Sequence, residues 1–175
     1  MYLFDPILIN SIIIIFVYAV PLYVANSVPV IIHGKTPLDF NKMLWGSPLF
    51  GKGKTIIGTL SGITSGTLIG AIIALIFPYI LVLIPNYIEV AFYLALGAIL
   101  GDLVKSFFKR RFKIKNGEKW DLADQLDFIL GGLVLSSIAL VPEYWVVIVL
   151  FIATFFIHKF TNWIAYIWKL KKVPW

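Results

Sequence analysis

The segment GDLVKSFFKRRFKIKNGEKWDLADQLD, residues 101–127, concentrates charge in a chain that is otherwise mostly apolar. It carries five of the nine acidic residues and seven of the fifteen lysines and arginines, while the sequence on both sides is almost uniformly hydrophobic. Charges in such surroundings must be solvated, paired or bound to ions. This segment is therefore the first candidate for a functional site.

The composition of the whole chain indicates a membrane protein. Of its 175 residues, 60% are hydrophobic and only 14% are charged, and the mean hydropathy is +0.92. Soluble domains carry about a quarter charged residues, which keep their surfaces in contact with water. We therefore expect one membrane-embedded domain that covers residues 1–175.

The charge and the cysteine content exclude several other classes of protein. The formal net charge is +6, but the lysines and arginines lie mainly in short loops between apolar segments. This placement favours contact with membrane lipids over binding of nucleic acid. The chain has no cysteine, which excludes disulfides, thiolate metal sites and cysteine catalysis.

Apolar segments of spanning length predict an all-α, polytopic membrane protein with about five transmembrane helices. A spanning helix needs about 20 mostly apolar residues. The expected spans are residues 6–27, 55–84, 87–108, 122–141 and 143–168, with tight turns at Pro85 and Pro142.

The lysines and arginines predict the orientation of these helices. They gather in the loops at residues 35–54 and 109–119 and in the tail at residues 169–172, whereas the turns at Pro85 and Pro142 carry none. Positively charged loops stay on the cytoplasmic side. We expect the N-terminus outside, the C-terminus in the cytoplasm, and a multi-pass protein of the cell membrane with its active site on the cytoplasmic side.

Three carboxylates are expected to converge near the cytoplasmic ends of the third and fourth spans. Asp102 shares a helix face with Ser106 and Lys109, and Asp124 and Asp127 share a face of the next helix. Antiparallel neighbours joined by a short loop would bring these faces together. Carboxylates so close repel one another unless a cation lies between them, and Mg²⁺ prefers oxygen ligands.

Ion pairs are the alternative to magnesium. The cations available for such pairs are Lys105, Lys109, Arg110 and Arg111. We favour the metal, because ion pairs do not explain why so many acids lie where burial is costly.

The second span begins with a candidate phosphate-binding segment. Gly51, Gly53, Lys54 and Thr55 place flexible backbone, an ammonium and a hydroxyl at a helix N-terminus, where free N–H groups favour anions. The alternative is an interfacial lysine that only follows the membrane topology.

Farther along the second span, small residues recur at every fourth position and predict close packing of helices. The packing could be within one chain or between two, so the oligomeric state stays open. The small residues are Gly58, Gly62, Gly66 and Gly70.

Two further polar sets lie at the ends of spans. Thr36-Pro37-Leu38-Asp39 is typical of a helix start and predicts a short interfacial helix over residues 40–45, with Asp39 as a cap or as a substrate ligand. In the last span His158, Thr161 and Asn162 share a face, which suits either a buried histidine or a binding role. Asn26 ends the first span on the same side.

The charged segment resembles a known enzyme signature. Residues matching the Gly-Asp-Leu and Ser-x-x-Lys-Arg parts of phosphatidate cytidylyltransferases are Gly101, Asp102, Leu103, Ser106, Lys109 and Arg110. Asp124 and Asp127 match its spaced acids, with Gln125 where the bacterial pattern has arginine, and the bacterial His-Gly-Gly segment is absent. The compact length and segments such as Ala25-Asn26-Ser27 and Lys172-Val173-Pro174-Trp175 are similar to the archaeal branch, the CDP-archaeol synthases.

This resemblance implies a reaction between CTP and an isoprenoid glyceryl ether lipid phosphate. The products would be a CDP-activated lipid and pyrophosphate, with Asp102, Asp124 and Asp127 holding Mg²⁺. Lys54, Lys109 and Arg110 would bind the triphosphate or the departing pyrophosphate. The other expected substrate contacts are Asn26, Asp39, Thr55, Gly58, Ser106, His158 and Asn162.

Two other functions would also use clustered acids. A CDP-alcohol phosphotransferase normally begins with Asp-Gly-x-x-Ala-Arg, which this chain lacks. A cation transporter or channel would line its path with acids, but the acids here gather at one side, and the halves of the sequence show no inverted repeat. We therefore expect the cytidylyltransferase.

Overall fold

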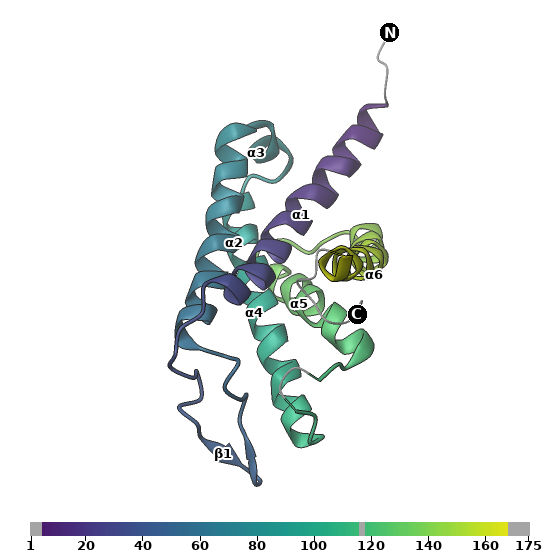
Figure 1. Ribbon diagram of the computed structural model, residues 1–175. Helices are drawn as coiled ribbons and strands as arrows, with labels where there is room; N and C mark the ends of the chain where they lie inside the picture. Colours follow the sequence, from purple (N-terminus) through teal and green to yellow (C-terminus); the bar gives the residue numbers. More distant parts are fainter. Residues whose placement is uncertain (1–4, 116–117, 168–175) are drawn as a thin grey trace.

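The computed structural model describes residues 5–115 and 118–167, and it is mostly helical with one small β-hairpin (Figure 1). The prediction of a mostly helical protein is confirmed. Along the chain the elements are α1 (Pro6–Ile31), β1 (Met43–Leu44), β2 (Ser47–Pro48), α2 (Ile56–Ile76), α3 (Tyr79–Leu83), α4 (Tyr87–Arg111), α5 (Asp121–Ser136) and α6 (Tyr144–Ile167).

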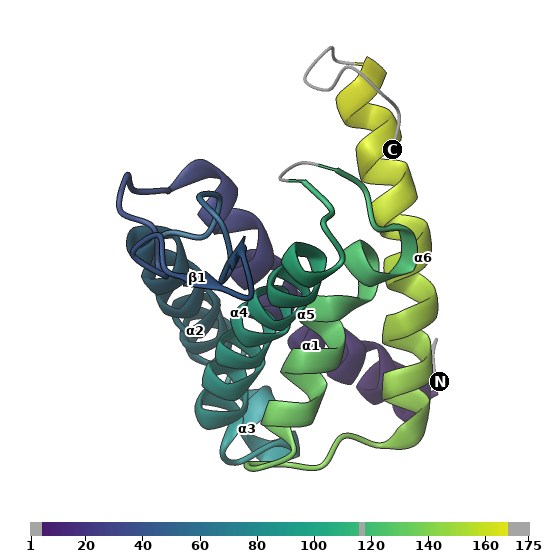
Figure 2. The same ribbon diagram turned by 90° about the horizontal axis from the view of Figure 1, so that it is seen from below.

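Within the described residues, three helices are long and apolar enough to cross a membrane, namely α1, α2 and α4. Helix α5 has 16 residues, fewer than the roughly 20 that a spanning helix needs. In α6 the side chains are described without a gap only over Tyr144–Ile157, which is an apolar stretch. Helix α6 is seen end-on in Figure 1 and lengthwise in Figure 2, so it runs across the direction of α2. Five spans and their orientation therefore stay a prediction.

A proline divides the segment that was expected to form one long second span. Helix α2 ends at Ile76 and the short helix α3 begins at Tyr79, directly after Pro78. Proline lacks an N–H and its ring clashes with the preceding helical turn, so a continuous helix through residue 78 is disfavoured.

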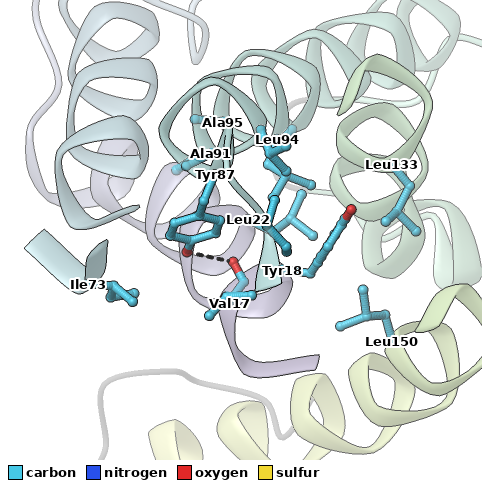
Figure 3. Close-up of a cluster of buried hydrophobic side chains, with 14 of the residues drawn as sticks. Val17, Tyr18, Leu22, Ile73, Tyr87, Ala91, Leu94, Ala95, Leu133 and Leu150 are labelled. Atoms are coloured by element: carbon cyan, nitrogen blue, oxygen red, sulfur yellow. Dashed lines mark hydrogen bonds between the residues drawn. The ribbon is translucent and has the colours of Figure 1, made fainter. Parts of the chain in front are cut away.

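Helix α4 is the centre of the fold and packs against α1, α2 and α5. Its buried face includes Tyr87, Ala91 and Leu94. The Tyr87 hydroxyl donates a hydrogen bond of 2.9 Å to the backbone carbonyl of Val17 in α1 (Figure 3). This bond satisfies the phenol inside an apolar core, where an unpaired hydroxyl would be costly.

The glycine stripe of α2 packs within the chain. Hypothetical Cβ atoms on Gly62, Gly66 and Gly70 would collide with side chains or backbone of α1 and α4, namely Ala25, Ala91, Ala95 and Ile99. One on Gly58 would instead meet the hydroxyl of Thr55. The prediction of close packing is confirmed, and the partners are helices of the same chain. The buried stripe residues are Gly58, Gly62, Gly66 and Gly70.

A second glycine contact joins α4 to α5. A Cβ atom on Gly97 would overlap the backbone of Gly131, and one on Gly101 would overlap the carbonyl group of Asp127. Only glycine allows two helix backbones to approach this closely. Because Asp102 follows Gly101, this contact brings the carboxylates of α4 and α5 to the same place.

The predicted interfacial helix over residues 40–45 is wrong, because this part of the loop forms a β-hairpin. Strand β1 pairs antiparallel with β2, with Leu44 opposite Ser47. The two residues between them, Trp45 and Gly46, have φ values of 51° and 75°. Two consecutive positive φ values are typical of a type I′ turn and are incompatible with a right-handed helix.

We expect Gly101→Ala to lower the free energy of unfolding by about 1–3 kcal/mol, because the added methyl group must push α5 away from α4. The measurement is thermal unfolding of the purified protein in detergent. Gly53→Ala is the control, since a Cβ atom at Gly53 would meet nothing within 4 Å. Equal unfolding temperatures for the two variants would contradict the close contact of α4 and α5.

Candidate active site

The structure brings the three carboxylates together around one lysine. The ammonium nitrogen of Lys105 lies 3.2 Å from Oδ1 of Asp102, 3.2 Å from Oδ1 of Asp124 and 2.7 Å from Oδ2 of Asp127. Lys105 and Asp102 come from the last turns of α4, whereas Asp124 and Asp127 come from the first turns of α5. The three carboxylates therefore lie close together, as their spacing in the sequence predicts. Their roles in catalysis stay predictions.

Two more lysines complete the cluster. Lys54 forms an ion pair with Asp102, and the Lys109 ammonium lies 3.1 Å from both carboxylate oxygens of Asp124. The three carboxylates thus contact three ammonium groups, and their formal charges cancel. Charge cancellation lowers the cost of burying these groups at the end of an apolar bundle.

The donor atoms of this cluster suit magnesium, which is commonly held by one or two carboxylates together with substrate phosphates. Oδ1 of Asp127 is buried and has no hydrogen-bond partner among the described groups. An unpaired buried carboxylate oxygen is costly unless a cation or a donor reaches it. Within residues 5–115 and 118–167, no group of three acidic, histidine or cysteine side chains is arranged to hold an ion. The three carboxylates are paired with lysines, which is the alternative that the sequence offered, and magnesium binding stays a prediction.

A cavity of about 290 Å³, here called the polar cavity, opens beside the cluster. Four of the charged side chains line it. They come from the loop before α2, from α4 and from α5, and they are Lys54, Asp102, Lys105 and Asp124. The predicted substrate contacts that also line it are Asn26, Thr55 and Gly58. The polar cavity therefore gathers residues from sequence positions 26 to 124.

Thr55 has a structural role at the rim of the polar cavity. Its hydroxyl oxygen accepts hydrogen bonds from the backbone N–H of Gly58, at 3.1 Å, and of Gly34, at 3.3 Å. It is the N-cap residue of α2, which satisfies a free N–H group of the first turn. The same contacts hold the start of α2 against the end of α1.

The remaining predicted residues do not line the polar cavity. The Lys109 ammonium, besides its contact with Asp124, donates a hydrogen bond of 2.5 Å to the backbone carbonyl of Glu118. Ser106 is buried on α4. Nε of Arg110 is buried and has no hydrogen-bond partner among the described residues. His158 and Asn162 belong to α6, but their side chains lie outside the part that the structure describes.

Asp39 holds the hairpin loop together. Its carboxylate accepts hydrogen bonds from the backbone N–H of Asn41 at 3.0 Å, Phe50 at 2.9 Å and Gly51 at 3.0 Å. Burial raises the pKa of Asp39, but these hydrogen bonds outweigh it and bring the pKa below the ordinary value. The predicted helix-capping role is wrong because no helix starts here, and a contact with substrate stays a prediction.

Two residues that sequence reasoning did not select matter to this geometry. Lys105 was considered only as one of several possible ion-pair partners, although its place one turn after Asp102 puts both on one helix face. Arg111 donates hydrogen bonds to the carbonyls of Pro48, at 2.8 Å, and Leu49, at 3.2 Å. Arg111 thereby ties the hairpin to the end of α4, and nothing in the local sequence signals this long-range contact.

Comparison with known proteins gives consistent matches along the chain. A family model described as CarS-like, CDP-archaeol synthase, matches residues 8–175. The CDP-archaeol synthase of Pyrococcus furiosus is 42% identical over 162 residues, which covers 91% of this chain and 96% of the relative. The CDP-archaeol synthase of Methanocaldococcus jannaschii is 37% identical over 166 residues, covering 90% and 94%.

A solved structure also resembles the described helices. It is described as an intramembrane enzyme for archaeal membrane lipids biosynthesis, with a TM-score of 0.75 and 34% sequence identity. The match covers 84% of this chain and 91% of that one.

We expect Asp39→Asn to loosen the hairpin loop, because a neutral amide is a weaker acceptor for three backbone N–H groups. Hydrogen exchange of the Phe50 and Gly51 amides, followed by mass spectrometry, should become faster at neutral pH. A lowered pKa stabilises the folded state above the unfolded pKa of about 3.9, so the wild-type loop should loosen only in more acidic solution. Unchanged exchange in Asp39→Asn would contradict the anchoring role.

Proposed function

The chain belongs to the CDP-archaeol synthase family, and on this premise we propose that it transfers the cytidylyl group of CTP to digeranylgeranylglyceryl phosphate, an unsaturated archaeal diether lipid phosphate. The resemblance noted in the sequence is confirmed. The protein is a membrane cytidylyltransferase of archaeal lipid biosynthesis. This assignment replaces the phosphotransferase and cation-transport alternatives.

The observation that carries the proposed chemistry is the cluster of three carboxylates and three lysines beside the polar cavity. An oxygen of the lipid phosphate attacks the α-phosphorus of CTP and forms a new P–O bond. The bond from that phosphorus to the oxygen shared with the β-phosphorus breaks, and pyrophosphate leaves. Such a step needs positioning and charge neutralisation and no nucleophilic side chain.

We assign Asp102, Asp124 and Asp127 to Mg²⁺. The ion, when bound, neutralises charge on phosphate oxygens and orients them. Asp102 and Asp124 line the polar cavity, and Asp127 has a buried oxygen without a partner among the described groups. Both facts support the assignment, because two of the carboxylates face the cavity in which substrate phosphates would lie and the third has an oxygen free to take a cation.

The lysines would bind the triphosphate once the carboxylates have taken another cation. Lys54 lines the polar cavity and its only partner of opposite charge among the described ion pairs is Asp102. Lys109 and Arg110 are consecutive residues of α4, about one turn after Lys105. Lys109 contacts Asp124 of the cluster, and we assign both residues to the departing pyrophosphate. Asn26, Thr55 and Gly58 line the cavity and are placed for contacts with the nucleotide.

The proposed topology has five spans, with the polar cavity open to cytosolic CTP. The lysine-rich loop that ends at Lys54 and the basic end of α4 both adjoin the cluster. Positive charge favours the cytoplasmic side of the membrane, which supports this orientation. The N-terminus would lie outside, and substrate lipid would approach sideways from the inner leaflet.

We expect Asp124→Asn and Asp127→Asn each to abolish CTP-dependent pyrophosphate release, because a neutral amide is a poor magnesium ligand. The assay measures pyrophosphate from purified protein with CTP, Mg²⁺ and the lipid phosphate, and detergent unfolding checks that each variant is folded. Asp5→Asn is the matched control: Asp5 caps the distant start of α1, and asparagine caps a helix equally well. Normal turnover in either test variant would remove the metal assignment.

We expect Lys54→Ala to raise the KM for CTP by roughly 10- to 100-fold, because a charge-assisted contact with phosphate is lost. The KM for the lipid phosphate should change much less. Lys52→Ala is the control, since Lys52 is an exposed lysine two positions earlier on the same loop. An unchanged KM for CTP in Lys54→Ala would show that this lysine serves only the membrane topology.

A further inference from the structure

A second concavity, here called the apolar groove, lies between α4 and α5 and has a volume of about 670 Å³. Its walls are apolar side chains of both helices, among them Leu100, Val104, Phe108, Leu130 and Val134. Along α5 it extends from Ala123 to Leu135, about 18 Å at 1.5 Å per residue.

The apolar groove is open to the surroundings of the helices. Val104, Leu130 and Val134 are 55%, 56% and 61% exposed although all three are large hydrophobic residues. In a membrane protein, an apolar channel of this kind between two helices is accessible to hydrocarbon chains and not to water.

The charged lining of this groove lies part-way along it, nearer to Phe108 and Ala123 than to Leu100 and Leu135. The charged residues that line it are Lys105 and Asp127, and their side chains contact each other at 2.7 Å. Lys105 also lines the polar cavity, together with Asp102 and Asp124. A single lysine therefore belongs to both concavities, and the groove passes beside the place of the proposed reaction.

We propose that the apolar groove binds an isoprenoid chain of the lipid substrate and that the Lys105 ammonium binds the phosphate of that lipid. This inference rests on the proposed function, in which Asp127 is engaged with Mg²⁺. Lys105 is then the cation that faces the groove. Because Lys105 also lines the polar cavity, a lipid phosphate held there would lie beside the proposed CTP site, where one of its oxygens could attack the α-phosphorus.

The charge pattern favours the substrate over other occupants. A second copy of the chain would cover the apolar side chains equally well, but it does not explain a lysine shared with the polar cavity. A hydrocarbon chain with a terminal phosphate matches this pattern, with the phosphate at Lys105 and the chain along the apolar wall from Leu130 to Leu135.

Leu130→Trp tests the groove by filling it. We expect equilibrium binding of radiolabelled lipid phosphate, measured in detergent without CTP, to weaken by about tenfold or more. Calorimetric binding of CTP with Mg²⁺ should stay unchanged. Leu68→Trp is the matched control, since Leu68 is a leucine on α2, outside the groove, with the same exposed fraction of 56%.

Lys105→Met tests the phosphate contact. Wild-type protein should prefer the lipid phosphate over the corresponding phosphate-free diether lipid, and we expect this preference to fall roughly 10- to 100-fold in Lys105→Met. Lys105→Arg should retain much of it, because the guanidinium keeps the charge. A merely structural role for Lys105 would weaken binding of both lipids alike and would leave the preference unchanged.

Several outcomes would overturn the inference. They are equal lipid binding in Leu130→Trp and Leu68→Trp, an unchanged phosphate preference in Lys105→Met, or a change of oligomeric state on filling the groove, which would make it an interface between copies. If wild-type protein binds both substrates and releases no pyrophosphate, the proposed function fails instead. The binding measurements would still decide what occupies the groove.

Discussion

The approach of α4 to α5 at Gly101 determines the position of the charged groups in this protein. The backbone carbonyl of Asp127 lies where a Cβ atom of any other residue at position 101 would be. At this distance Asp102, Asp124 and Asp127 all reach Lys105. If the two helices were farther apart, the three carboxylates could not all contact the same ammonium group.

The balance of charge within the cluster explains how these acids are accommodated beside an apolar bundle. Each carboxylate contacts at least one lysine, and the lysines come from the hairpin loop as well as from α4. A change of partners, in which a divalent cation takes the carboxylates and phosphates take the lysines, would keep each of these charged groups paired. The pairing of Lys54 with Asp102 also links the loop before α2 to the centre of the site.

Helix α4 separates two environments that a lipid-modifying enzyme needs. The polar cavity is lined from α1, the loop before α2, α4 and α5, and the apolar groove lies between α4 and α5. Asp39 and Arg111 hold the hairpin loop beside the polar side, through contacts with Phe50, Gly51 and Pro48. A water-soluble nucleotide and an apolar lipid could thus reach one lysine from different directions.

The sequence alone determined the membrane class, the main helices and the meeting of three acids, because hydrophobic length and helical periodicity are local properties of the chain. The spacing of the acids along the chain also places them on defined helix faces. Only the tertiary structure decided that Lys105 lies between them, that residues 43–48 form a hairpin, and that α2 packs its glycines on α1 and α4. These features depend on partners that are far away in the sequence. An example is Arg111 of α4, which donates hydrogen bonds to the carbonyls of Pro48 and Leu49. Such contacts are determined by how the helices and loops pack, and the local sequence pattern does not predict them.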